Sequence, residues 1–208
     1  MTLLLVRHGQ SAGNASRIIQ GWLDAPLTTL GHQQAGAVAD RLATAGASRL
    51  YVSTLERAAN TAAPIARATG LEAEPLDEWR EYCWGEAQGR TWTEALALWG
   101  RGDPPTLDWG TSQVPGEEGE AAFAARITEA FTTLLERHED DLAIVVTHGG
   151  VIIEVVKHVF AVEGYRPVST PTNTSVSTFT LERGVPVIAA YNDASHLHPL
   201  DVTAPPPA

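Results

Sequence analysis

The sequence predicts an α/β fold with a mostly parallel central sheet and helices on both of its faces. Two apolar runs without a polar residue, 3–6 and 142–146, are typical of strands buried on both sides. Segments with apolar residues at helical spacing alternate with such runs along the chain. Polar, glycine-containing segments follow both runs, and folds of this class bind ligands at the carboxyl ends of their strands. The fold class therefore indicates where a site should lie.

The first third of the chain alternates strands and helices around one long polar loop. The first helix begins at Thr29, after the loop. Gly70 directly follows the second helix, as is typical of a helix C-terminus. The predicted elements are a strand at 3–6, a loop at 7–21, a helix from 29 to about 46, a strand at 50–52, a helix at 55–69 and a weak extended segment at 71–75.

The segment 79–117 interrupts this alternation. Five of the six tryptophans lie between Trp79 and Trp109, among clustered glycines and prolines. We interpret this segment as a Trp-rich, cap-like insertion over the site, within a single domain that spans 1–203. The other predicted elements are helices at 92–99, 118–138 and 151–160, a strand at 142–146, strands at 175–181 and 185–191 joined by a hairpin turn, and a tail at 204–208 that we expect to fray.

Composition restricts the compartment and the partners. The 208 residues include 14 basic and 25 acidic ones, and the formal net charge of −11 opposes nonspecific attraction to nucleic acid or anionic membrane. No apolar run approaches the roughly 18 residues of a membrane span. The only cysteine, Cys83, cannot form an intramolecular disulfide. We therefore expect a soluble, cytoplasmic protein that binds neither nucleic acid nor membrane, and a homodimer is compatible with the sequence.

Two histidines stand at equivalent places, because His8 and His148 each follow a predicted buried strand. The carboxyl ends of parallel strands share one edge, so the two side chains should converge. Neutral imidazole is a nucleophile, the guanidinium of Arg7 matches phosphate oxygens, and Gly9 would let an anion approach backbone N–H groups. This combination suits attack on phosphorus. For His8 alone, a hydrogen-bonded residue at a strand end is an equally simple alternative.

Six segments spread over most of the chain carry motifs rich in Arg, His, Gly and acidic residues. They are LVRHGQSAGN at 5–14, QGWLDAPLT at 20–28 with Leu30-Gly31, STLERA at 53–58 with Thr61-Ala62, Glu81 with Gly85-Glu86 and Gly89, THGG at 147–150, and NDASHL at 192–197. Together they resemble the motifs of the histidine phosphatase superfamily, also called phosphoglycerate mutase-like. The resemblance implies the α/β fold of that family and catalysis of phosphoryl transfer.

The resemblance implies catalytic roles for five residues. His8 would be the nucleophile that becomes phosphohistidine, while Arg7, Arg57 and His148 would bind the phosphoryl oxygens. Two guanidinium groups and an imidazolium would neutralise the charge on a transferring phosphoryl group. Glu81 would protonate the leaving oxygen and then deprotonate the attacking water, a task for a carboxyl that can change protonation state near neutral pH.

Four more positions in these motifs are expected to contact the substrate, with Asn14 as an additional donor to the pocket. They are Asn14, Gln20, Gly21 and Gly149. We expect no cofactor, and no metal, because the chain lacks His-Glu-x-x-His or a comparable ligand spacing.

The catalytic roles of Arg57 and Glu81 each have an alternative explanation. Arg57 lies early in a helix and could be solvated or paired with Glu56 or Asp40. The assignment of Glu81 depends on the resemblance. The neighbouring acids that compete for its role are Asp77, Glu78 and Glu86.

Two activities share this machinery. A phosphatase admits water to the phosphoenzyme, whereas a phosphoglycerate mutase returns the phosphoryl group to its substrate. Mutases of the family resemble one another in carrying additional basic residues between the acid and second-histidine motifs. Here the 66 residues between Glu81 and His148 contain no lysine and only four arginines, with none paired in sequence: Arg90, Arg101, Arg126 and Arg137.

The segment 85–92 also resembles the Gly-Glu-x-x-Gly-x-Thr-Trp pattern of the small phosphatases in the family. We therefore predict metal-independent hydrolysis of small phosphomonoesters, with a small phosphorylated metabolite as partner and inorganic phosphate as product. A cofactor-dependent phosphoglycerate mutase is the alternative, and a phosphate-recognising module without turnover is the second alternative.

The chain departs from the phosphatase pattern at 115–119, where Pro-Gly-Glu-Glu-Gly replaces Pro-Gly-Gly-Glu-Ser, and at Ala87 and Arg90. The tryptophans of the insertion allow two interpretations. They could form a small core that holds an irregular segment together, which is the simpler structural reading, or an apolar wall for the leaving group. Replacing Trp84 or Trp92 should change the ranking of substrates only in the second case.

Overall fold

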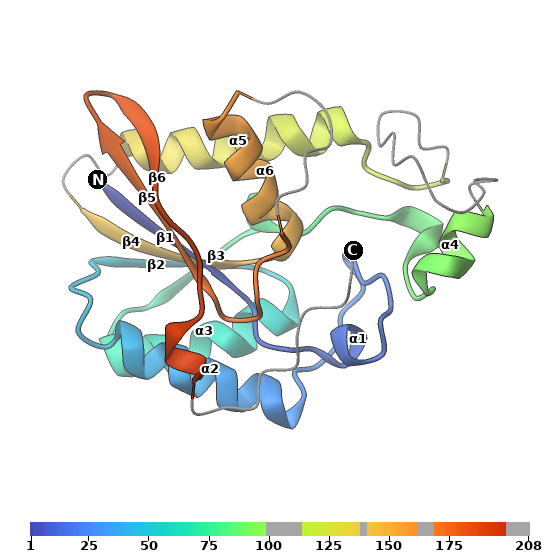
Figure 1. The fold of residues 1–208 in the computed structure, drawn as a ribbon, viewed down its shortest axis with the longest axis horizontal. Coiled ribbons are helices and arrows are strands. Elements are labelled where there is room, and N and C mark those ends of the chain that lie inside the picture. Colours follow the sequence, from blue (N-terminus) through green and yellow to red (C-terminus); the bar gives the residue numbers. More distant parts are fainter. Residues whose placement is uncertain (99–113, 138–140, 162–168, 199–208) are drawn as a thin grey trace.

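A six-stranded sheet with the order β3-β2-β4-β1-β5-β6 lies at the centre of the molecule (Figure 1). The computed structural model describes residues 1–98, 114–137, 141–161 and 169–198. The first four strands run parallel, while β5 and β6 extend the sheet as an antiparallel hairpin. The predicted α/β class with a mostly parallel sheet is confirmed. The strands are β1 (Thr2–Arg7), β2 (Arg49–Ser53), β3 (Ala73–Leu76), β4 (Leu142–Thr147), β5 (Val176–Glu182) and β6 (Val185–Asp193).

Helices cover both faces of the sheet, as predicted, with α2 and α3 on one face and α5 and α6 on the other (Figure 1). Successive residues of β1 belong to different cores. Leu3 and Leu5 lie in the core under α5 and α6, and Leu4 and Val6 lie in the core under α2 and α3. A strand between two helical layers has no solvent-facing side, so its sequence is apolar without interruption. These helices are α2 (Thr29–Leu42), α3 (Glu56–Thr69), α5 (Glu120–Arg137) and α6 (Gly149–Val159).

Local signals in the sequence account for where the helices begin and end. Thr28 caps α2, since its hydroxyl accepts the Gly31 N–H at 3.0 Å. Gly70 ends α3 with a φ of 73°, in the left-handed region that glycine adopts without steric cost. The helix predicted at 92–99 is observed as α4 (Trp92–Leu98). The short α1 (Ala12–Ala15) inside the first loop was not predicted.

The described tryptophans of the insertion contribute to two cores. Trp79 is fully buried in the main core under α5 and α6. Trp84 packs against this core and also against a small second core of Ile19, Ala87, Ala95 and Val114, and its ring meets the Trp92 ring edge-on at 5.1 Å. This packing favours the small-core interpretation for Trp84. The cap-like role of 79–117 stays a prediction, since 99–113 lie outside the described residues, as does the tail at 204–208.

The parallel pairing of β1 with β4 aligns the ends of the two strands. Arg7 pairs with Thr147, and the His8 N–H donates to the Thr147 carbonyl at 2.8 Å. On the other side of β4, Val52 of β2 pairs with Val146. The residues that follow β1, β2 and β4 therefore meet at one edge of the sheet.

Candidate active site

His8 and His148 converge as predicted. Their ring centroids lie 5.2 Å apart with 58° between the ring planes, and both side chains are buried. The register of β1 and β4 causes this approach, because each histidine directly follows the last residue of its strand. The two imidazoles thus form the centre of a site built from chain segments that are far apart in sequence.

The hydrogen bonds of His8 define its protonation state. Nδ1 lies 2.7 Å from the Gly9 carbonyl oxygen, so this nitrogen carries the proton and donates it. Nε2 accepts the Nε–H of Arg57 at 3.3 Å. Burial, followed by the cations of Arg57 and Arg7, lowers the pKa of His8 well below its ordinary value. His8 is therefore neutral at pH 7, with an unprotonated Nε2, which is the form a nucleophile needs.

His148 is oriented by Ser53, at the end of β2. Its Nε2 lies 2.7 Å from the Ser53 hydroxyl, which also accepts the Leu55 N–H at 3.4 Å. We assign the Ser53 hydroxyl as the donor of this hydrogen bond and the His148 Nε2 as its acceptor. Burial, followed by Arg57, lowers the pKa of His148 well below its ordinary value. A neutral His148 that accepts at Nε2 carries its proton on Nδ1. That atom is buried and has no partner within the described residues, so it can donate to a ligand.

Arg57 is almost completely buried beside His8. Its Nη2 donates to the Gly21 carbonyl at 2.8 Å and its Nη1 to the Leu23 carbonyl at 3.2 Å. Among the described residues these carbonyls and His8 are its hydrogen-bond partners, rather than Glu56 or Asp40. Burial lowers the pKa of Arg57. Because its Nε–H donates to His8, the guanidinium of Arg57 lies directly beside the Nε2 of His8.

Arg7 contributes a second buried guanidinium. Its Nη1 donates to the Pro171 carbonyl, and its Nε is buried without a partner in the described part of the chain. Burial lowers the pKa of Arg7 to about 10, a shift that Glu81 opposes, and the group stays charged at pH 7. Two buried cations and an unsatisfied imidazole N–H around one unprotonated Nε2 suit a phosphoryl dianion.

The side chain of Glu81 lies against the N-terminus of α6, the helix that follows His148. Its carboxylate accepts the Gly150 N–H at 3.0 Å and the Tyr82 N–H at 2.9 Å. A Cβ added to Gly150 would lie 2.3 Å from a Glu81 carboxylate oxygen, so a side chain there would displace the carboxylate. Of the competing acids, Asp77 is bound to Arg80 and Thr54, each at 2.6 Å.

The additional residues predicted to bind substrate mostly contact other parts of the protein. The Asn14 Oδ1 accepts the Ser11 N–H at 3.2 Å in a capping box, so the amide nitrogen is the end that could donate to a phosphoryl oxygen. The Gln20 Oε1 accepts the Ser11 hydroxyl at 2.7 Å. The Gly21 carbonyl holds Arg57, as described above. A Cβ on Gly149 would lie 3.4 Å from the Arg7 Nε. Contact of these four residues with substrate stays a prediction.

Sequence reasoning missed three residues that support the site. Ser53 orients His148, Thr61 accepts the Gly9 N–H at 2.9 Å, and the Asn173 side chain donates to the His8 carbonyl at 2.9 Å. Ser53 and Thr61 stand in the segment that carries the second arginine motif, which could have indicated them. Asn173 carries no motif, and it reaches His8 because β5 runs antiparallel to β1 and begins beside its end.

The fold and this buried basic site define an enzyme that acts on phosphoryl groups, and comparison with known proteins identifies its family. The sequence matches the histidine phosphatase superfamily (branch 1) over residues 3–194. Phosphoglycerate mutase-like protein 4 of Arabidopsis thaliana is 36% identical over 204 residues, covering 94% of this chain and 86% of that protein.

Solved structures agree. The mycobacterial glucosyl-3-phosphoglycerate phosphatase has a TM-score of 0.81 at 26% identity, covering 93% of this chain and 99% of that one. Phosphoserine phosphatase from Entamoeba histolytica, in complex with 3-phosphoglyceric acid, has a TM-score of 0.79 at 27% identity, covering 94% and 98%. The chain belongs to the histidine phosphatase superfamily and is an enzyme of the phosphatase class.

Two further findings concern the described residues only. No group of three His, Cys, Asp or Glu side chains lies together there as a metal ion would require. None of the helices in that part of the chain is both long and apolar enough to cross a membrane.

Proposed function

We propose that the protein hydrolyses small phosphomonoesters through a phosphohistidine on His8, without a metal ion. One observation carries the proposal. The unprotonated Nε2 of His8 accepts a hydrogen bond from Arg57, and the imidazole of His148 lies 5.2 Å from that of His8. In the same buried site, Arg7 Nε and His148 Nδ1 have no protein partner among the described residues. A phosphoryl group supplies the oxygens that such donors need.

In the first step, the Nε2 of His8 attacks phosphorus and the bond to the leaving oxygen breaks. The electron pair of that bond goes to the leaving oxygen, which takes the proton of the Glu81 carboxyl and departs as an alcohol. Arg7, Arg57 and His148 stabilise the charge that the three other phosphoryl oxygens carry.

In the second step, a water molecule attacks the phosphorus of the phosphohistidine. It gives a proton to the Glu81 carboxylate while the P–N bond breaks and its electron pair returns to Nε2. The products are inorganic phosphate, neutral His8 and a protonated Glu81, which is ready for another cycle. Ester and water are thereby converted to alcohol and phosphate.

Mutase activity is the alternative, and the name of the Arabidopsis thaliana relative is the observation that favours it. Of the four arginines between Glu81 and His148, Arg126 is held by Glu118 and Arg90 donates to the Glu86 carbonyl at 3.0 Å. Arg137 is exposed at the end of α5, and Arg101 lies outside the described residues. These contacts support hydrolysis, because they leave few cations for a phosphoglycerate carboxylate.

The test is phosphate release from a panel of phosphomonoesters at pH 5 to 8 with EDTA present. His8→Ala should abolish release, while His32→Ala, at an exposed histidine of α2, should not change it. Release that EDTA stops would contradict the metal-independent mechanism. No release by the wild type, together with isomerisation of 3-phosphoglycerate, would show a mutase. Binding of vanadate with neither activity would show a recognition module.

A further inference from the structure

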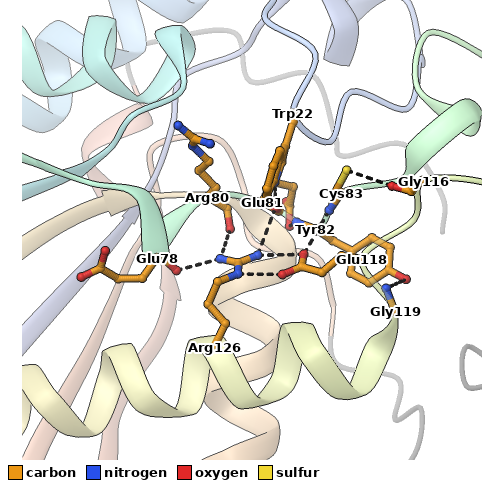
Figure 2. A network of polar contacts seen from close by, with 10 residues as sticks. All are labelled: Trp22, Glu78, Arg80, Glu81, Tyr82, Cys83, Gly116, Glu118, Gly119 and Arg126. Carbon is orange, nitrogen blue, oxygen red and sulfur yellow. Dashed lines mark hydrogen bonds and ion pairs between the residues drawn. The ribbon is translucent and has the colours of Figure 1, made fainter.

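Arg126 of α5 binds the backbone of the segment that carries Glu81 (Figure 2). Its guanidinium reaches three carbonyl oxygens of this short segment. Nη1 donates to the carbonyls of Glu78 at 2.7 Å and Arg80 at 3.0 Å, and Nη2 approaches the Glu81 carbonyl at 3.4 Å. One side chain thus holds the turn that leads into the proposed general acid.

Glu118 holds Arg126 in this position. The two side chains form a two-pronged ion pair, with Nε to Oε1 at 2.7 Å and Nη2 to Oε2 at 2.8 Å. Both side chains are largely buried, at 20% and 13% exposed, so the pair is better shielded from solvent than a surface ion pair. Glu118 also accepts the Cys83 N–H at 3.2 Å. The pair therefore binds the chain on both sides of Glu81.

Trp22 binds the same carbonyl with a second donor. Its Nε1 donates to the Glu81 carbonyl at 2.7 Å, and the guanidinium carbon of Arg80 lies 5.1 Å from the centroid of its ring. The main chain of Glu81 is thus held from α5 and from the loop after Gln20, while its carboxylate meets the Gly150 N–H. Such contacts restrict where the carboxyl can move.

We propose that Arg126, held by Glu118, is a positioning residue that keeps the Glu81 carboxyl within proton-transfer distance of the leaving oxygen. The inference rests on the proposed function. It also assigns a role to the 115–119 segment, where Glu118 is retained although its neighbours depart from the phosphatase pattern. Lysine could not replace Arg126, because a single ammonium lacks the planar fork that binds a carboxylate and several carbonyls at once.

A purely structural ion pair would make a different prediction. If Arg126 only stabilised the fold, its loss would affect all substrates alike. If it positions a general acid, the loss depends on how much the leaving oxygen needs a proton. An alkyl alcohol needs one, whereas p-nitrophenolate leaves readily without it.

The experiment compares kcat/KM for 2-glycerol phosphate and p-nitrophenyl phosphate in Arg126→Lys, with Arg137→Lys on the same helix as the matched control. We expect Arg126→Lys to lose about tenfold on the alkyl ester and less than about twofold on the aryl ester. Inorganic phosphate should bind as in the wild type. Equal losses on both esters, or no loss on either, would overturn the proposal. If Arg126→Lys does not fold, Glu118→Gln carries the same test.

Glu81→Gln separates this inference from the proposed function. Glu81→Gln should lose more activity on the alkyl ester than on the aryl ester, and this difference should exceed that of Arg126→Lys. In the double variant, Arg126→Lys should not increase the difference further. If Glu81→Gln lost activity equally on both esters, Glu81 would not be the general acid, and the inference about Arg126 would be overturned together with that assignment. Selectivity in Glu81→Gln but not in Arg126→Lys would overturn the inference alone and leave the proposed function standing.

Discussion

At the scale of single residues, the site depends on which nitrogen of each imidazole carries a proton. His8 donates from Nδ1 to its neighbour's carbonyl, and His148 is held at Nε2 by Ser53. Burial, followed by the nearby arginines, lowers the pKa of both histidines and so disfavours a second proton on either ring. The two histidines of this pocket are thereby held through different ring nitrogens, consistent with the proposed roles of His8 as nucleophile and His148 as donor.

Ser53→Ala tests the orientation of His148. Loss of the hydroxyl frees the imidazole to rotate and to change tautomer, so we expect kcat/KM for phosphomonoesters to fall about tenfold. Unfolding should require about 1 kcal/mol less free energy, since a buried nitrogen loses its partner. Steady-state kinetics and urea unfolding measure the two effects. Ser48→Ala, at a half-buried serine just before β2, is the control and should keep full activity.

At the scale of elements, a strand or helix could be predicted from the sequence where its own residues carry the pattern that specifies it. The apolar runs of β1 and β4 and the caps of α2 and α3 are local, so these elements and the convergence of His8 with His148 could be predicted. The pairing of β5 with β1 joins residues far apart in sequence, and nothing in either strand specifies its partner. Asn173, which this pairing brings to His8, could not be predicted for the same reason. α1 has four residues, too few to show a period.

Gly150, in the first turn of α6, has no side chain, and the carboxylate of Glu81 lies close to its backbone. In Gly150→Ala the new Cβ would displace the Glu81 carboxylate, the mobile end of a side chain, so the fold can adjust. Alanine also favours a helix over glycine by up to about 1 kcal/mol. We expect kcat/KM for alkyl phosphates to fall about tenfold or more while the melting temperature is unchanged or higher.

Gly36→Ala in α2 is the matched control for Gly150→Ala, because a Cβ at Gly36 meets nothing within 4 Å. It should raise stability by about 0.5–1 kcal/mol without changing activity. A Gly150→Ala enzyme that stays fully active would show that the close approach of Glu81 to α6 is not needed for turnover.

At the scale of the whole molecule, the C-terminal NDASHL segment supports the site from outside the pocket. The His196 Nδ1 lies 3.2 Å from the Arg41 guanidinium, which also pairs with Asp193, and its Nε2 lies 3.3 Å from the Thr174 hydroxyl. The Thr174 N–H in turn donates to the Arg7 carbonyl. His196 therefore connects α2 to the strand end that carries Arg7 and His8.

Stability should fall in mild acid because of His196. Burial, followed by Arg41, lowers its pKa to about 4 despite the nearby Asp193, whereas the unfolded chain binds the proton near the ordinary value of 6.5. Between these values the unfolded state holds more protons, so the free energy of unfolding falls as the pH drops, by at most about 1.4 kcal/mol per pH unit for one proton. Urea unfolding from pH 7 to 4 should show a shallower slope in His196→Gln than in the wild type. Equal slopes would contradict the assignment.

The net charge of the chain and the charge of its site have opposite signs. A formal charge of −11 repels free anions at long range, while Arg7 and Arg57 attract them at contact distance. The approach of an anion to the site is therefore disfavoured, but an anion that reaches the pocket meets buried donors without a partner among the described residues.

Arg7 Nε and His148 Nδ1 have no partner among the described residues, which has a consequence for how the proposed turnover would end. These donors recognise the oxygens of a phosphoryl group and not the alcohol attached to it, so the released phosphate is as good a ligand for them as the ester. If the protein hydrolyses esters as proposed, plentiful phosphate should therefore compete with a new ester for the site. We expect competitive product inhibition, with a rate that depends on the ratio of ester to phosphate.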